Sequence, residues 1–177
     1  MIISISGTPG VGKTKVSKML AKKLRLKIVR LDKLIKKFNL IEGFDKKRNA
    51  FIVDEKNLKK IKINGNFIID GHLSHFIPND LTIVLRLDPK KLRERLKSRK
   101  WKKDKIEENV MAETLDIIYT EALKCKKEKI TKNVVQIDTT NKSINSIVKR
   151  ILNMLKEEKY KSDDVDWLSK LENGEIL

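Results

Sequence analysis

"GTPGVGKT" occupies residues 7–14, between the apolar run "IISIS" at 2–6 and the helical pattern "KVSKMLAKKL". It satisfies the spacing G-x-x-x-x-G-K-[ST] of a phosphate-binding loop. Glycines let the backbone turn tightly and bring its N–H groups close to phosphate oxygens. A helix that starts directly after such a loop directs the positive end of its dipole at the same place. The order of strand, glycine loop and helix therefore predicts a site for phosphate groups rather than an ordinary turn.

Two side chains of this loop and one aspartate further along the chain suit phosphoryl chemistry. Lys13 can reach the outer phosphates of a nucleotide, and the Thr14 hydroxyl can bind magnesium. Asp70 ends the apolar run at 66–70, where its carboxylate can hold the same ion directly or through water. The alternative for Asp70 is a capping or loop aspartate with no ligand.

Five short apolar runs, rich in β-branched residues, are typical of buried parallel strands. They lie at 2–6, 27–31, 66–70, 81–87 and 133–138. Helical patterns between them include a helix capped by Asp88 with Pro89 in its first turn, one long helix over 104–124, and a last helix from about Ser143. This alternation predicts an α/β fold, a five-stranded parallel sheet with helices on both faces, in a single domain of residues 1–177.

Composition and charge limit the kinds of partner that this protein can have. The formal net charge of the 177 residues is +17, which favours an anionic partner such as RNA; lysines on solvated helix faces are nearly as consistent with it. No run is long and apolar enough to span a bilayer, and the first residues lack the pattern of a signal peptide. We therefore expect a cytoplasmic protein with no membrane partner. Cys125 is the only cysteine, so no internal disulfide can form.

Polar residues near the ends of other strands are candidates for a second ligand, because open α/β sheets bind ligands beyond the carboxyl ends of strands. Asp32 could orient a second substrate or cap the next helix. Arg86, in a strand that should be buried, needs an anion, either a phosphate group or an acid on a neighbouring element. His72 could contact a second substrate or act as a switch, whereas we expect His75 to be structural or exposed.

A basic stretch and an acidic tail complete the pattern. "RERLKSRKWKKDK" at 93–105 places cations between two helices, where a phosphoryl-transfer enzyme would carry a closing lid. A solvated turn or an RNA-binding patch is the alternative. The tail at 162–177 is acidic and contains Trp167, and it could dock on the basic body or serve as a mobile arm for a partner.

Six stretches carry a wider resemblance, which runs from about residue 1 to residue 155. They are "GTPGVGKT", "FIVDEKNL", "IIDGHLSHFIP", "IVLRLDP", "RLKSR" and "ENVMAETLDIIYTEA". In this order they resemble the adenylate kinase isoenzyme 6 family, small nuclear and archaeal ATPase–kinases linked to assembly of the small ribosomal subunit. Many nucleotide hydrolases share the first stretch, whereas the third and the last are much more specific.

The resemblance implies the P-loop fold of nucleoside monophosphate kinases, with ATP and Mg²⁺ bound and AMP as acceptor. It implies a lid over about 98–108 and a monophosphate-binding segment over about 30–53. The residues that it implies for the ATP site are Gly10, Gly12, Lys13, Thr14, Lys15 and Arg99. Asp70 and His72 take the positions of the family's aspartate–x–histidine motif, but Gly71 stands where many eukaryotic members have tyrosine. The segment 30–53 also lacks the threonine–glycine–aspartate and arginine pattern of ordinary adenylate kinases.

The main hypothesis is reversible transfer of the γ-phosphoryl group of MgATP to AMP, with Lys13, Arg99 and Asp70 as catalytic residues. No general base is required, because the attacking phosphate oxygen of AMP is already anionic at neutral pH. The candidates for acceptor contacts are Asp32, Asp54, His72 and Arg86. Two rivals stay open: an ATPase switch whose client is a small-subunit ribosomal protein of the uS11 type or rRNA, and a kinase of another nucleoside monophosphate or small molecule.

Overall fold

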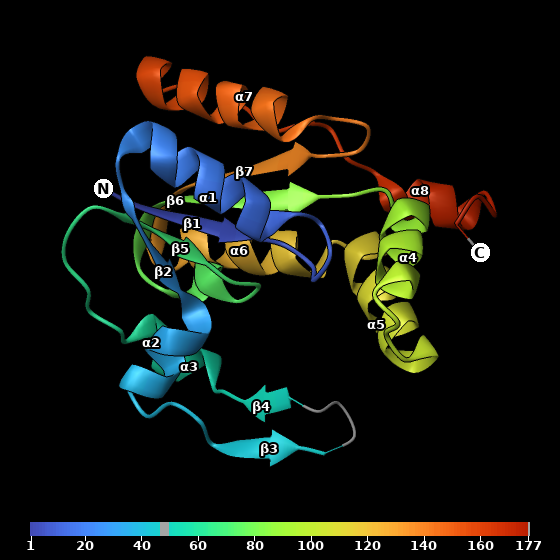
Figure 1. The fold of residues 1–177 in the computed structure, drawn as a ribbon, viewed down its shortest axis with the longest axis horizontal. Coiled ribbons are helices and arrows are strands. Elements are labelled where there is room, and N and C mark those ends of the chain that lie inside the picture. Colours follow the sequence, from blue (N-terminus) through green and yellow to red (C-terminus); the bar gives the residue numbers. More distant parts are fainter. Residues whose placement is uncertain (47–49, 177) are drawn as a thin grey trace.

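A computed structural model describes residues 1–46 and 50–176, and Figure 1 shows their arrangement. Five strands form one parallel sheet in the order β2-β5-β1-β6-β7. Their bounds are β1 Ile2–Ser6, β2 Lys27–Arg30, β5 Phe67–Asp70, β6 Asn79–Arg86 and β7 Thr131–Asp138. The predicted α/β fold and its five strands are confirmed. The first and last residues of each strand lie within two residues of the predicted ones.

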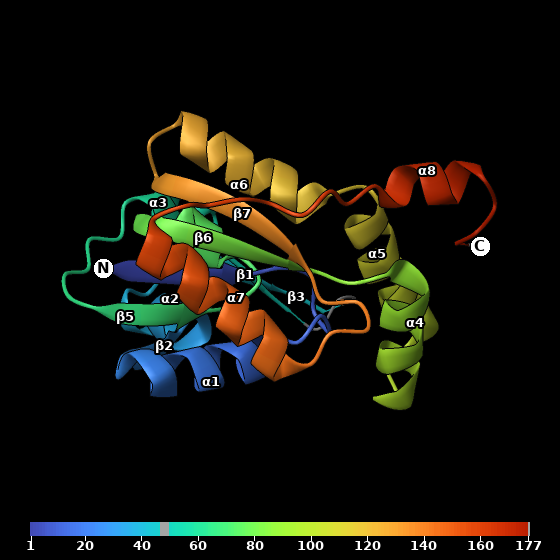
Figure 2. The ribbon, with the colours of Figure 1, turned by 90° about the horizontal axis from the view of Figure 1, so that it is seen from above.

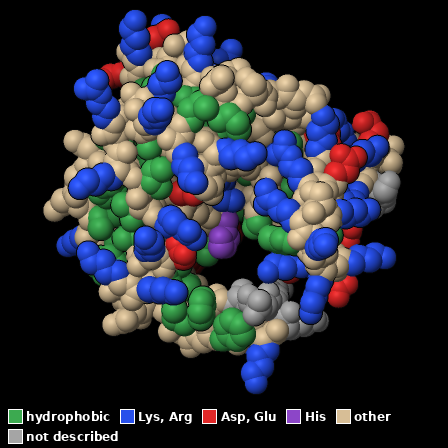
Figure 3. All heavy atoms as spheres, viewed as in Figure 1, with side chains coloured by type: hydrophobic (Ala, Val, Ile, Leu, Met, Phe, Trp, Pro, Cys, Tyr) green, Lys and Arg blue, Asp and Glu red, His purple; other side chains and the backbone are tan. Residues whose placement is uncertain are grey.

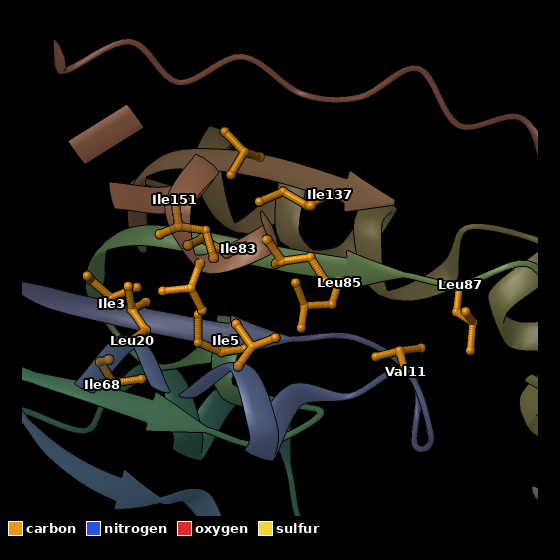
Figure 4. Packing of buried hydrophobic residues seen from close by; sticks show 14 of the residues in the cluster. Ile3, Ile5, Val11, Leu20, Ile68, Ile83, Leu85, Leu87, Ile137 and Ile151 are labelled. Carbon is orange, nitrogen blue, oxygen red and sulfur yellow. The ribbon is translucent and has the colours of Figure 1, made fainter. Parts of the chain in front are cut away.

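Helices cover both faces of the sheet (Figure 2). α1 (Lys13–Leu24) and α7 (Ile144–Glu157) lie on one face, and α6 (Ile117–Lys127) lies on the other. The main core fills the space under the first pair, where Leu20 and Ile151 meet isoleucines of the strands (Figure 4). Within the described residues, no helix combines the length and the apolar character that crossing a membrane requires.

The parallel register brings the carboxyl ends of the strands to one edge of the sheet. Asp70 pairs with Ile5 on one side and with Arg30 on the other. The glycine loop leaves β1 at this edge, and α2 (Leu31–Lys37) leaves β2 there. The glycine loop, Asp70 and the start of α2 are therefore neighbours in space although they are far apart in the sequence.

Two helices extend the molecule beside this edge. α4 (Pro89–Ser98) and α5 (Lys103–Thr114) pack on each other, and we call them, with the turn 99–102, the α4–α5 arm (Figure 1). α4 begins as predicted, because the Asp88 carboxylate accepts the backbone N–H of Lys90 at 2.9 Å and Pro89 is the first helical residue. The predicted start of the last helix is also confirmed, since Ser143 caps α7.

The single long helix expected over 104–124 is wrong, because the chain breaks between α5 and α6. Asp116 adopts a left-handed conformation with φ of 56°, which aspartate tolerates better than most residues, and its carboxylate bonds to the Arg86 guanidinium. The break turns α6 onto the sheet and leaves Ile117, its first residue, exposed.

A small hairpin was not predicted. β3 (Gly43–Asp45) and β4 (Ala50–Ile52) pair antiparallel, with Phe44 opposite Phe51 and their rings 5.6 Å apart. The hairpin and the short helix α3 (Glu55–Lys59) project from the same edge of the sheet as α2 (Figure 1). Residues 47–49 of the expected monophosphate-binding segment lie outside the described residues.

The acidic tail docks on the body, which decides between its two alternatives. It runs along β7, where the Asp163 backbone N–H donates to Gln136, and then forms α8 (Trp167–Glu172) beside the α4–α5 arm (Figure 2). Arg93 of α4 donates to the carbonyl of Ile176 at 2.8 Å. Trp167 is buried in a small cluster of the tail's own apolar side chains.

Candidate active site

The glycine loop has the geometry that phosphate binding requires. At Gly7, a Cβ would lie 2.4 Å from the carbonyl oxygen of Leu85, so the loop runs too close to β6 for any side chain. Gly12 has φ of 111°, and a Cβ there would meet nothing within 4 Å. The backbone thus turns sharply and leaves open space in front of the first residues of α1, where helix N–H groups are free to bind an anion.

The Lys13 ammonium lies inside this loop. Its Nζ donates to the carbonyls of Gly7 at 2.8 Å and Thr8 at 3.1 Å. Burial lowers the pKa of Lys13 to about 8, against the opposing influence of the carboxylates of Asp70 and Glu113. A phosphate oxygen is a stronger partner for an ammonium than a carbonyl, so a bound nucleotide could take over these two contacts.

Thr14 and Asp70 form a pair of oxygen ligands. The Thr14 hydroxyl donates to Oδ2 of Asp70 at 2.8 Å. Oδ1 of the same carboxylate is buried and has no hydrogen-bond partner. A buried carboxylate oxygen without a partner is costly unless a ligand completes it, and hydroxyl and carboxylate oxygens are the ligands that Mg²⁺ prefers. These two residues therefore fit a magnesium ion, and their geometry disfavours the alternative of a simple capping aspartate.

Two connected hollows on one side of the loop suit a nucleotide. A hollow of about 240 Å³ lies over the loop itself, and a second of about 280 Å³ lies between α4 and the start of α7. We call them the donor hollows. Both are lined by four of the residues implied for the ATP site, namely Gly10, Gly12, Lys15 and Arg99. Arg95, Lys142 and Ile144 extend the second hollow away from the loop.

A larger cavity of about 550 Å³ lies on the other side of the loop, and we call it the acceptor cavity. It is bounded by the loop, α2, β4 and the segment after β5. Lys13, Thr14 and Asp70 line it, and Lys13 and Thr14 also line the hollow over the loop. Figure 3 shows a hollow on this face, with a histidine at its edge and lysine and arginine side chains nearby.

Two predicted acceptor residues line this cavity. Asp32 is paired with Arg30, whose Nη2 lies 2.9 Å from Oδ2, and it does not cap α2, because the residue at the cap is Arg30. His72 is exposed and lines the cavity, whereas His75 is fully buried. Desolvation within the cleft, together with the Lys13 ammonium, lowers the pKa of His72 to about 4. His72 is therefore neutral at physiological pH.

Two other predicted acceptor residues do not line the cavity. Asp54 caps α3 by accepting the backbone N–H of Lys56 at 2.8 Å. Arg86 is fully buried at the end of β6 and pairs with Glu113, with Nε 2.7 Å from Oε1. The anion that Arg86 needs is therefore an acid on a neighbouring helix, which corrects the expectation that it would contact a phosphate group.

Sequence reasoning missed other residues of the acceptor cavity. Arg30 and Lys36 place two cations on it, and Phe51 places an aromatic ring there. The rule that ligands bind beyond strand ends could have found Arg30, because it ends β2. Phe51 depends on the hairpin, which carries no local motif. His75, expected to be structural or exposed, is structural: its Nδ1 lies 2.9 Å from the Ser6 hydroxyl.

Solved structures of nucleotide-binding enzymes share this fold. Deoxyadenosine kinase from M. mycoides with bound dATP gives a TM-score of 0.55 at 21% identity, with 88% of this chain and 100% of that chain covered. The YorR protein from Bacillus subtilis, in complex with phosphorylated GDP, gives a TM-score of 0.57 at 18% identity, with 89% and 97% covered. Fold and loop together define the chain as an α/β protein with a phosphate-binding loop.

Sequence relatives narrow this class to one family. Residues 3–116 match a family described as "AAA domain". The "Putative adenylate kinase" of Methanocaldococcus jannaschii is 37% identical over 175 residues, which cover 96% of this chain and 94% of that protein. The protein of the same name from Pyrococcus furiosus is 44% identical, with 94% and 91% covered. The chain belongs to this family of archaeal nucleotide kinases, which confirms the resemblance based on its motifs.

Proposed function

We propose that this protein transfers the γ-phosphoryl group of MgATP to AMP and forms two ADP. One observation carries the proposal: Lys13 and Thr14 line both the hollow over the glycine loop and the acceptor cavity. A nucleotide in the donor hollows would therefore present its terminal phosphate to a second molecule on the other side of the same lysine. Such an arrangement suits direct transfer between two bound substrates better than release of phosphate to water.

The residues act by position and charge. Lys13 on one side and Arg99 on the other would hold the transferring group and offset the charge that develops on its oxygens. Thr14 and Asp70 would hold magnesium, which supplies further charge neutralisation when it is bound. The cations of Lys13 and Lys36 at the acceptor cavity favour an acceptor that carries phosphate, and the neutral ring of His72 can donate one hydrogen bond to it.

The acceptor is proposed to be AMP for two reasons. The cavity combines apolar walls from Ile35, Ile41 and Phe51 with cations near the loop, which suits a base at one end and a phosphate at the other. The relatives that cover 96% and 94% of this chain carry the name "Putative adenylate kinase". Residues 30–53 would form the monophosphate-binding segment within a single domain of residues 1–177.

Residues 98–108 would act as a lid. They contain Arg99, the turn of the α4–α5 arm and several lysines, and they border the donor hollows. Closure of such a cationic segment over the phosphates would exclude water and bring Arg99 onto the transferring group.

A coupled assay on the purified protein tests the proposal. With MgATP present, we expect ADP to form at a rate that depends on added AMP, and GMP, CMP, UMP and a shikimate-type acceptor to be poorer substrates. A protein that uses CMP or UMP better than AMP would contradict the choice of acceptor. ATP turnover that no monophosphate accelerates would contradict transfer itself.

A second candidate function is an ATPase switch for small-subunit ribosome assembly, with a ribosomal protein of the uS11 type or rRNA as client. It is favoured by the net charge of +17 and by the exposed apolar side chains of the hairpin, Phe44, Phe51 and Ile52. Phosphate release stimulated by such a client without AMP would support it. RNA affinity that falls steeply with added salt would support a direct rRNA contact.

A further inference from the structure

An ionic network with a fully buried Arg86–Glu113 pair lies behind the glycine loop. Arg86 is 1% exposed and Glu113 is 2% exposed. The Arg86 guanidinium donates to Oε1 of Glu113 at 2.7 Å, to the backbone carbonyl of Glu113 at 2.8 Å, to Gln136 at 2.7 Å and to the carboxylate of Asp116. These residues come from β6, β7, α5 and the turn before α6.

The Glu113 carboxylate also reaches the glycine loop. Its Oε1 accepts the backbone N–H of Leu87 at 3.1 Å, and its Oε2 accepts the Thr8 hydroxyl at 2.5 Å. Thr8 is the second residue of the loop and is 1% exposed. Both oxygens of this buried carboxylate therefore have partners, and one of those partners belongs to the loop that would hold the nucleotide.

Thr8 connects the network to the lysine of the site. Its side chain donates to Glu113, and its backbone carbonyl accepts a hydrogen bond from Lys13 at 3.1 Å. A shift of Thr8 would therefore displace one of the two contacts that place the ammonium. Two other loop side chains are placed differently: Val11 is buried in the main core but carries no hydrogen-bonding group, and Pro9 lines the acceptor cavity.

The contribution of such a network to the stability of the fold does not explain why the chain has it. Burial of an ion pair costs about as much as its attraction returns, so apolar residues of similar volume would serve a purely structural role as well. A buried network that is fully satisfied does hold its members in one arrangement. In this chain the network fixes the position of the glycine loop relative to α5.

We propose that Glu113 is a positioning residue, which holds the glycine loop in its nucleotide-binding shape through Thr8 and ties that shape to the α4–α5 arm. The inference rests on the proposed phosphoryl transfer, and it adds a residue outside the nucleotide contacts. Glu113 and Arg99 both belong to the α4–α5 arm. The arm therefore supports the glycine loop through Glu113 and also carries the arginine that would close over the bound phosphates.

The sharpest test is Thr8→Val, which keeps the shape of the side chain and removes the hydroxyl. Thr114→Val is the matched control: Thr114 is the next residue along α5, is also 1% exposed, and its hydroxyl bonds only within the helix, to Val110 at 2.9 Å. Thr8→Ser restores the hydroxyl. MgATP affinity by calorimetry and ADP formation are measured for each, at a temperature where thermal unfolding shows the variant to be folded.

We expect Thr8→Val to weaken MgATP binding about fivefold or more and to lower kcat about tenfold, with KM for AMP changed less than twofold. Thr8→Ser and Thr114→Val should stay within about twofold of the parent. Equal losses in Thr8→Val and Thr114→Val would overturn the proposal, as would full affinity and kcat in Thr8→Val. MgATP affinity tests the inference even if AMP proves not to be the acceptor.

A double-mutant cycle tests whether Thr8 acts through Glu113. Glu113→Met has a similar length and removes both oxygens, so that Thr8 loses its partner. If the variant is folded, adding Thr8→Val to it should lower MgATP affinity by less than twofold more. Losses that multiply would contradict the proposal. If Glu113→Met does not fold, the comparison of Thr8→Val with Thr8→Ser and Thr114→Val still decides.

Discussion

Lys13 stands between the donor hollows and the acceptor cavity, and its surroundings explain how it could serve both. Two loop carbonyls hold the ammonium in place. The same side chain can turn to the phosphates of a bound nucleotide without a change in the backbone. The motif spacing predicts the position of this lysine, because a phosphate-binding loop is a local structure. It does not predict that burial holds the pKa of the lysine near 8.

Loss of the Lys13 ammonium should abolish most of the activity. We expect Lys13→Ala to lower kcat for ADP formation about a hundredfold or more, because the charge that offsets the transferring phosphoryl group is gone. Lys18→Ala is the control, since Lys18 lies on the exposed side of the same helix. Turnover by Lys13→Ala within a few-fold of the parent would show that another cation has this role.

Nucleotide binding should take up a proton at high pH. In the free protein the lowered pKa of about 8 leaves Lys13 charged at pH 7 and mostly neutral at pH 9, whereas bound phosphates favour the charged form. Calorimetry in buffers of different ionisation enthalpy should therefore find uptake of nearly one proton at pH 9 and little at pH 7.5. Lys13→Ala should show none. Equal uptake at both pH values would contradict this.

Other residues of the site depend on partners that no local pattern reveals. Arg86 stands at a strand end, where a phosphate contact is reasonable, and only the packing of α5 shows that Glu113 is its partner. Asp54 follows a short strand and caps the next helix instead of lining the acceptor cavity. The sequence therefore predicts the positions of the loop residues correctly. It does not predict the partner of a residue when that partner lies on a distant helix or strand.

Among the elements, the strands of the main sheet can be predicted from the sequence. The break between α5 and α6 and the hairpin β3–β4 cannot. β-branched runs mark the central strands because both faces of the sheet are buried. The break between α5 and α6 escapes periodicity, since the left-handed Asp116 is stabilised by Arg86 from another element. The hairpin β3–β4 also escapes, because its strands of three residues each are too short to show alternation.

The tail offers a prediction about an element. Partial burial opposes it, but the hydrogen bonds from Arg150 and from the backbone N–H of Asp138 lower the pKa of Asp163. A carboxylate with a lowered pKa stabilises the fold above its ordinary pKa, and this contribution is lost as pH falls through the lowered value. We therefore expect the tail to detach in acid, before the sheet unfolds.

Asp163→Asn should reproduce this loss at neutral pH. We expect it to lower the free energy of unfolding by about 1–3 kcal/mol and to shift Trp167 emission to the red, measured in a Trp101→Phe background so that one tryptophan reports. The neighbouring, exposed Asp164 provides the control, and Asp164→Asn should change neither quantity. A tail that stays docked in Asp163→Asn would mean that the apolar cluster around Trp167 is sufficient to hold it.

In the whole molecule, the parallel sheet explains why one loop can serve two substrates. All five strands direct their carboxyl ends to one edge, so the donor hollows and the acceptor cavity meet over β1, the central strand, with the α4–α5 arm on one side and the hairpin on the other (Figure 1). The alternation of strands and helices predicts the parallel sheet, but it does not predict the strand order that places β1 at the centre. The size and lining of the acceptor cavity follow from the packing of α2 and the hairpin, which the sequence does not reveal.

A crystal structure with magnesium and two adenosines linked through a chain of phosphates would show whether one loop serves both substrates. We predict one adenosine in the donor hollows beside Arg95, the other in the acceptor cavity against Phe51, and the phosphate chain across Lys13, whose Nζ has left the carbonyls of Gly7 and Thr8. A complex in which the phosphate chain avoids the loop, or in which Lys13 keeps both carbonyls while the second adenosine lies outside the acceptor cavity, would contradict the account.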